Sequence, residues 1–123
     1  MQTLASILVF IIALEHLLIL YLEMFLWAKP KGRKIFAMSE EQAEATKVLA
    51  ANQGLYNGFL AAGLFWSLVY PAPEVAYHIQ LFFTVCVLVA GLYGGATASK
   101  VIYKVQALPA FITLAVLLAT GYL

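Results

Sequence analysis

Charged side chains are scarce in this chain of 123 residues. Asp, Glu, Lys and Arg make up only 11% of it, whereas 64% of its residues are hydrophobic. Soluble domains average about one quarter charged and about one half apolar residues. The composition therefore argues against a soluble globular domain, and the length predicts a single domain that covers residues 1–123.

Cysteine is almost absent, and the familiar catalytic and metal-binding motifs are missing. Cys86 is the single cysteine, so an internal disulfide is excluded. We expect Cys86 to lie in an apolar helix and to pack as a small hydrophobic residue. The chain lacks GxSxG, CxxC and phosphate-binding glycine patterns, and no HExxH pattern accompanies His16. We therefore predict no metal site, and the residues identify no cofactor. The basic cluster at 29–34 is short and next to a span, so we expect no nucleic-acid partner.

Long apolar runs occupy most of the chain. Each approaches the roughly 20 residues that a spanning helix needs. Within lipid the backbone must satisfy its own hydrogen bonds, which only helices and closed β-barrels can do. The runs lack the alternation of apolar and polar residues that barrel strands show. We predict an all-α membrane protein, a four-helix transmembrane bundle with spans at 4–27, 54–70, 75–97 and 105–123.

The second span is expected to begin as a cytoplasmic helix. Ser39 and Gln42 form a capping-box pattern, in which Ser39 is the N-cap. No Pro or Gly interrupts residues 40–53, so this helix should continue into the span. Pro30 and Gly32 predict a turn before it.

Basic residues orient the predicted spans. Four lie in the first loop (29–34) and two in the third (100–104), whereas the second loop has only Glu74. The positive-inside rule then places the first and third loops in the cytoplasm and both termini outside. Five aromatic residues near span ends are expected to anchor the protein at the bilayer surface: Trp27, Tyr70, Tyr77, Tyr103 and Tyr122.

Ionisable residues interrupt the first span. Glu15, His16 and Glu23 would lie within the membrane, where such groups are rare and usually functional. His16 and Glu23 are seven residues apart and should share a helix face. A proton-carrying or ligand-binding role and a structural hydrogen bond between helices both fit these residues.

The second span opens with the amide-rich stretch NQGLYNG at 52–58. Its amides donate and accept hydrogen bonds at once, which suits a polar network or an uncharged ligand group. Gly54 and Gly58 form a GxxxG step that allows close helix approach. Interhelical packing and ligand binding remain equal alternatives here.

The third span carries a polar and small-residue stripe opposite an apolar face. The stripe is expected to pack, while Phe82, Val85, Val89 and Leu92 suit lipid. The members of the stripe are Gln80, Thr84, Gly91, Gly94 and Gly95. Seven residues are predicted to lie at a similar depth in the membrane, so they could face one pocket that opens to the cytoplasm. Glu15 and His16 would lie deeper. The seven are Glu23, Asn52, Gln53, Tyr56, Asn57, Tyr93 and Gln106.

Five segments resemble a known family: EH at 15–16, EMFLW at 23–27, NQGLYNGFLA at 52–61, YG at 93–94 and LPA at 108–110. They are similar to domain-of-unknown-function family 1304, whose members are small bacterial membrane proteins. The resemblance covers nearly the whole chain. It implies a four-span, multi-pass protein of the bacterial inner membrane and carries no established activity.

The order of elements also resembles the MAPEG superfamily of glutathione-using membrane enzymes. Those enzymes rely on several arginines, whereas Arg33 is the only arginine here. The likeness is therefore architectural and does not extend to a glutathione site.

Three functions follow as hypotheses. The first is binding or transport of a small polar or amphipathic molecule in the predicted pocket, with Glu15 as proton carrier. The second is a membrane enzyme on a lipid-like substrate, with His16 as general acid/base. The third is a structural or accessory subunit. The expected partners are the lipid bilayer, a small-molecule ligand and further copies of the chain in a homo-oligomer.

Overall fold

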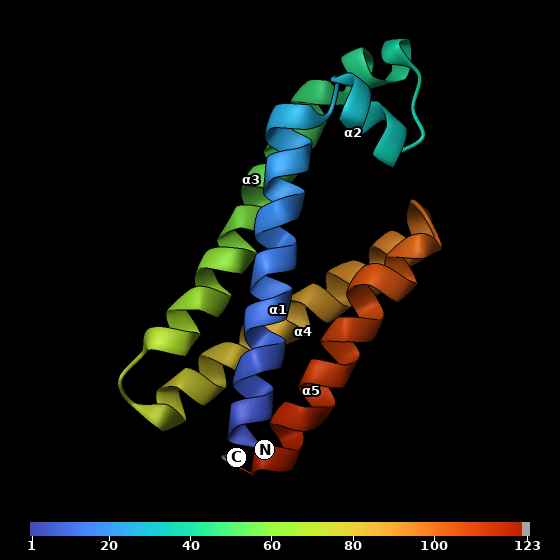
Figure 1. The fold of residues 1–123 in the computed structure, drawn as a ribbon. Coiled ribbons are helices and arrows are strands. Elements are labelled where there is room, and N and C mark those ends of the chain that lie inside the picture. The colour runs from blue at the N-terminus through green and yellow to red at the C-terminus, as the bar shows by residue number, and fades with distance from the viewer. Residues whose placement is uncertain (122–123) are drawn as a thin grey trace. The chain divides into compact units, whose positions relative to one another are not determined.

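A computed structural model describes residues 1–121, in which every regular element is a helix and short loops join the helices. Residues 122–123, including the predicted anchor Tyr122 and the end of the predicted fourth span, lie outside the described residues. Between the α-helices lie two π-helical turns, labelled η. The elements are α1 (Gln2–Tyr21), η1 (Leu22–Leu26), α2 (Pro30–Ile35), α3 (Glu40–Val69), α4 (Pro73–Thr97), η2 (Tyr103–Ala107) and α5 (Leu108–Thr120) (Figure 1).

Three helical stretches among the described residues are long and apolar enough to cross a membrane. They are Gln2–Leu26, Pro73–Thr97 and Tyr103–Thr120. The all-helical prediction is confirmed, and three of the four predicted spans coincide with these stretches. The other predicted span, 54–70, overlaps the second half of α3 and is not among the three, because the amides at its start lower its hydropathy.

The capping box predicted at the start of α3 is confirmed. The backbone N–H of Gln42 donates to Ser39 Oγ at 3.1 Å, and the backbone N–H of Ser39 donates to Gln42 Oε1 at 3.1 Å. These bonds satisfy two donors that a helix start otherwise leaves unpaired. The helix then continues without a break to Val69, as the uninterrupted sequence predicts.

Replacing Ser39 with alanine should destabilise the protein by about 1 kcal/mol, because the N-cap acceptor is lost. The midpoint of thermal unfolding in detergent measures this loss. Ser39→Asp is the matched control, since aspartate keeps an acceptor at the same position. Equal midpoints for Ser39→Ala and the unmodified protein would show that the cap contributes nothing.

The turn predicted at Pro30 and Gly32 is instead a short helix, α2. Proline suits the first turn of a helix, where its missing N–H removes no bond. Gly32 lies directly against the Leu26 carbonyl group, so a side chain there would clash with backbone. The glycine thus permits close packing of α2 on η1 and does not break the helix.

Two compact units make up the chain, and each is described by itself. Unit 2 comprises residues 14–61. In it, a Cβ added to Gly54 would lie 2.8 Å from Met24 Cγ and 3.0 Å from Glu23 Cβ. A Cβ on Gly58 would meet the Leu20 side chain. The GxxxG step therefore brings α3 close to α1 and η1, as predicted.

Unit 1 comprises residues 1–13 and the chain from residue 62 onward. Within it, α4 packs along η2 and α5 (Figure 1). The predicted faces of α4 are confirmed except at Gly94, which is only half-buried: Gln80, Thr84, Gly91 and Gly95 are buried, while the four residues assigned to lipid are exposed. The polar stripe is therefore the packing face of this helix.

Candidate functional site

A carboxylate and an amide meet inside unit 2. Asn57 Nδ2 donates to Glu23 Oε1 across 2.6 Å. Glu23 comes from η1 and Asn57 from α3, and only 8% of the surface of Glu23 is exposed. Of the nine residues predicted to bind a ligand, these are the two that form a side-chain bond with each other.

Two local features position this pair. The π-helical turn η1 winds with i to i+5 bonds, so it rotates Glu23 relative to the α-helix before it. Gly54, one turn before Asn57, lets α3 approach η1 closely enough for the short bond. Turns of this kind occur frequently at functional sites.

A cavity of about 300 Å³ opens beside Glu23. Its other lining residues are Met24, Phe25, Trp27, Ala28, Lys29, Glu44 and Lys47. Lys47 forms an ion pair with Glu44 at 2.7 Å. Glu23 forms no ion pair with any residue in 1–121. The cavity therefore places Glu23, which has no ion-pair partner within residues 1–121, beside aromatic and aliphatic walls that also carry Lys29 and the Glu44–Lys47 pair.

Glu15 and His16 lie in α1, which precedes η1. His16 is fully buried, and it lines none of the three cavities described in this section. Glu15 is half-buried, and its Oε1 atom has no hydrogen-bond partner within residues 1–121.

The other amides of the NQGLYNG stretch do not reach Glu23. Asn52 is exposed and donates to the Val48 carbonyl of its own helix at 2.8 Å. Tyr56 is exposed and lies 6.0 Å from Phe59 between ring centroids. Gln53 lines a separate cavity of about 490 Å³, together with Trp27, Ala37, Met38, Gln42, Thr46, Leu49 and Ala50.

Trp27 lines both cavities of unit 2. Its indole N–H donates to Thr46 Oγ1 at 2.9 Å, and its ring lies 4.7 Å from that of Phe36 between centroids. Trp27, which was predicted to be an interfacial anchor, thus also forms part of the wall of each cavity. The fluorescence of Trp27 should therefore respond to binding in either cavity.

Tyr93 and Gln106 belong to unit 1. Tyr93 is exposed, and Gln106 Nε2 donates to the Val87 carbonyl oxygen at 3.1 Å. Gln106 is carried by η2, so each π-helical turn holds a polar residue that bonds to a neighbouring helix. The common pocket predicted for all seven residues stays a prediction.

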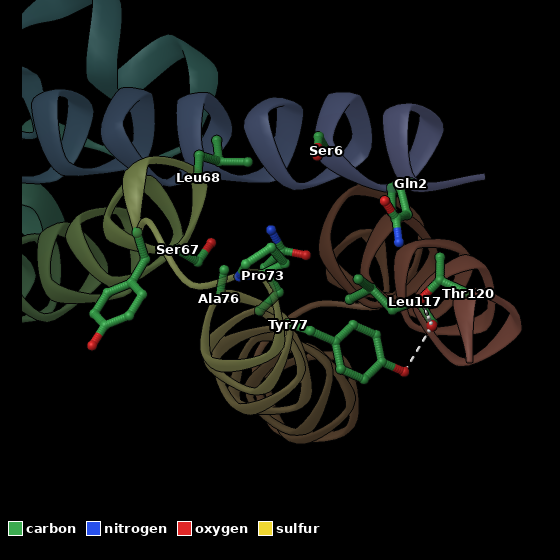
Figure 2. Close-up of a pocket in the computed structure, with 12 residues that line it drawn as sticks. Gln2, Ser6, Ser67, Leu68, Pro73, Ala76, Tyr77, Leu117 and Thr120 are labelled. Atoms are coloured by element: carbon green, nitrogen blue, oxygen red, sulfur yellow. Dashed lines mark hydrogen bonds between the residues drawn. The ribbon is translucent and has the colours of Figure 1, made fainter. Parts of the chain in front are cut away.

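A cavity that sequence reasoning missed lies in unit 1 (Figure 2). Its volume is about 170 Å³. The residues around it come from α1, the end of α3, the start of α4 and the end of α5. They are Gln2, Ala5, Ser6, Ser67, Leu68, Tyr70, Pro73, Ala76, Tyr77, Gln80, Leu117 and Thr120.

The assignment of Tyr77 as an interfacial anchor is wrong. Only 4% of its surface is exposed, and its hydroxyl donates to the Leu117 carbonyl at 2.8 Å (Figure 2). The polar stripe of α4, to which Gln80 belongs, was the signal that pointed to this region. The contributions of Ser6, Ser67 and Thr120 carry no such signal, because they come from three other helices.

No group of three or more His, Cys, Asp or Glu side chains that could hold a metal ion occurs within residues 1–121.

Comparisons with known proteins give a family but no activity. The model of the family described as "Protein of unknown function (DUF1304)" matches residues 10–118. A relative in Lactococcus lactis subsp. lactis (strain IL1403), "Uncharacterized protein YpaA", is 34% identical over 108 residues. That alignment covers 86% of this chain and 89% of the relative. No solved structure matches.

Proposed function

Since the chain belongs to the DUF1304 family of proteins of unknown function, we propose its function from its own residues and geometry. The protein is a multi-pass membrane protein that binds a small amphipathic molecule beside the Glu23–Asn57 pair. The observation that carries this proposal is the bond between these two side chains at the edge of a cavity.

Four membrane crossings agree best with the charges of the loops. If α3 did not cross, the basic loops at 29–34 and 100–104 would lie on opposite sides of the membrane. With α3 as a fourth span, both loops lie in the cytoplasm, as the positive-inside rule requires. The proposal is therefore a four-helix protein of the bacterial inner membrane with both termini outside, assembled as a homo-oligomer. The likeness to the MAPEG superfamily stays a prediction.

The carboxylate of Glu23 has capacity for a ligand. A carboxylate offers about four acceptor positions on its two oxygens. Asn57 uses one of them at Oε1, and Glu23 also lines the 300 Å³ cavity. The bond from Asn57 fixes the orientation of the side chain, so a ligand would meet a positioned acceptor. Such preorganisation lowers the entropy lost on binding.

The walls of the cavity indicate the chemical class of the ligand. Glu23 would accept hydrogen bonds from an ammonium group, and the rings of Phe25 and Trp27 attract cations through their faces. Met24 and Ala28 supply apolar surface for a short hydrocarbon part. An amphipathic amine fits this combination. Transport of the same ligand would use Glu15 as the proton carrier.

Octylamine is expected to bind saturably to the full chain in detergent and to change the fluorescence of Trp27. A Trp66→Phe background leaves Trp27 as the only tryptophan, because the chain has two. Glu23→Gln should weaken octylamine binding by about tenfold, the effect of losing one charge-assisted hydrogen bond. The titration of Trp27 emission measures this change.

Matched probes and variants make this test specific. Octanol and octanoate have the same hydrocarbon chain, and both should bind weakly because they lack the cationic group. Glu74→Gln removes the same charge from an exposed glutamate outside the cavity and should leave binding unchanged. Equal responses to octylamine and octanol, or equal binding by Glu23→Gln and the unmodified protein, would reject the proposal.

A purely structural role is the second candidate, because Glu23 and Asn57 already bond to each other at 2.6 Å. It predicts no saturable binding of octylamine, together with a loss of stability when either partner is replaced. The enzyme hypothesis has no such support, since His16 lines none of the three cavities.

A further inference from the structure

We propose that unit 1 contains a second binding site, specific for a small uncharged molecule with several hydrogen-bond donors. The site is the 170 Å³ cavity that Gln80 lines. It goes beyond the function proposed above and does not depend on Glu23, because every lining residue belongs to unit 1.

The amide of Gln80 is the first observation. Only 9% of the residue is exposed, and its side chain forms no hydrogen bond with any residue in 1–121. Interior amides usually bond to a protein group, whereas the amide atoms of Gln80 are not fully buried and reach the space of the cavity that this residue lines. Gln106 of the same unit shows the usual solution, because it donates to the Val87 carbonyl. Gln80 faces a cavity instead, so a guest in that cavity is its available partner.

The hydroxyl groups of the cavity set the polarity of the guest. Ser67 donates to the Leu64 carbonyl at 2.5 Å, Tyr77 to Leu117 at 2.8 Å and Thr120 to Leu117 at 2.7 Å. These three hydroxyls therefore use their hydrogens on the backbone, and the oxygens of Ser67 and Thr120 keep lone pairs as acceptors. Figure 2 shows these three side chains around one space. A guest must supply donors to match them.

The lining contains no charged side chain. A cation or anion would find no ion-pair partner there and would lose its hydration, which is strongly unfavourable. The volume is that of about six water molecules in the liquid, which suits a small guest. Ureas, amides and small polyols have the required size, neutrality and donors.

Thr84 extends the same polar face. It is one turn beyond Gln80 on α4, it is fully buried, and its Oγ1 has no hydrogen-bond partner within residues 1–121. Thr84 does not itself line the cavity, but its unsatisfied hydroxyl lies one turn from the Gln80 amide and continues the polar face of α4.

The test is a titration of the full chain in lipid nanodiscs with urea and with glycerol, followed by saturation-transfer NMR. Saturable binding of at least one probe is expected. Gln80→Met should weaken it by about tenfold or more, because methionine has a similar length but no hydrogen-bonding group. Ala76→Leu, which adds bulk to the cavity wall and keeps Gln80, should weaken it as well.

Thr113→Val is the matched control, because Thr113 is a buried polar residue of unit 1 outside the cavity and bonds only to Pro109 of its own helix. This variant should bind urea and glycerol as the unmodified protein does. Gln80→Met should also unfold at the same or a higher temperature, since no protein group loses a partner. A structural role for Gln80 would lower that temperature instead.

Three results would overturn the proposal. The first is the absence of saturable binding of both probes, which would mean that the cavity holds water only. The second is equal binding in Gln80→Met and the unmodified chain. The third is equal binding of guanidinium and urea, because guanidinium has the same shape and differs in its charge.

Discussion

Replacing Asn57 with leucine is expected to destabilise the protein by about 2–3 kcal/mol, because the buried acceptor Glu23 Oε1 then loses its donor. Leucine has a similar size, so the change removes hydrogen bonding more than volume. Removal of one partner is more damaging than removal of both, since the remaining polar group stays buried and unsatisfied. The midpoint of thermal or denaturant unfolding in detergent measures the loss.

A second substitution separates this cause from a general effect of leucine. The double variant Glu23→Met with Asn57→Leu should recover much of the lost stability, because both polar groups are then gone. Asn52→Leu makes the same change at an exposed amide that bonds only to its own helix, at the Val48 carbonyl. A loss in Asn52→Leu equal to that in Asn57→Leu would show that the Glu23 contact is not responsible.

The helices were predictable because local sequence determines them. The apolar runs, the capping box at Ser39 and the alternation of faces on α4 each depend on residues within a few turns of one another. Such patterns need no knowledge of distant contacts. The start of α3 and the buried stripe of α4 therefore follow from the sequence alone.

The partners of the polar residues were not predictable in the same way. Glu23 and Asn57 are 34 residues apart, so their bond depends on how two helices pack. The π-helical turn η1 adds to the difficulty, because it changes the rotation on which any helical-wheel argument for His16 and Glu23 relies. An i to i+5 turn has no composition signal that distinguishes LEMFL from ordinary helix.

The cavity around Gln80 shows the same limit. Three of its hydroxyl groups come from Ser67, Tyr77 and Thr120, on three different helices. Each residue alone fits an ordinary interhelical contact or a surface position. The acceptor-rich character arises only when the three hydroxyls are seen to donate to backbone carbonyls. Hydrogen-bond direction therefore carries information about ligand chemistry that sequence does not contain.

The other large effect is expected from Gly91→Ala, which should destabilise unit 1 by about 1–3 kcal/mol through overpacking. The added Cβ would lie 2.8 Å from the backbone nitrogen of Ala107 and 3.0 Å from its Cα. Backbone atoms cannot rotate away, so α4 and η2 would have to separate. The unfolding midpoint of the full chain measures this effect.

Gly94→Ala is the matched control on the same helix. Its Cβ would lie 3.3 Å from two side-chain atoms of Ile102, which can shift by a small rotation. Alanine also favours a helix over glycine by up to about 1 kcal/mol, so this variant should be neutral or slightly stabilised. If Gly94→Ala were as destabilised as Gly91→Ala, the loss would reflect the helix and not the contact with η2.

The substitution Gly91→Ala should also disturb the hydrogen bond of Gln106. The added Cβ would lie 3.1 Å from Gln106 Cγ, and the amide of Gln106 bonds to Val87, one turn before Gly91. Separation of η2 from α4 would lengthen that bond. The effects of Gly91→Ala and Gln106→Ala should therefore be less than additive in the double variant, because the first substitution already weakens what the second removes. Strict additivity would mean that the glycine contact and the amide bond hold η2 independently.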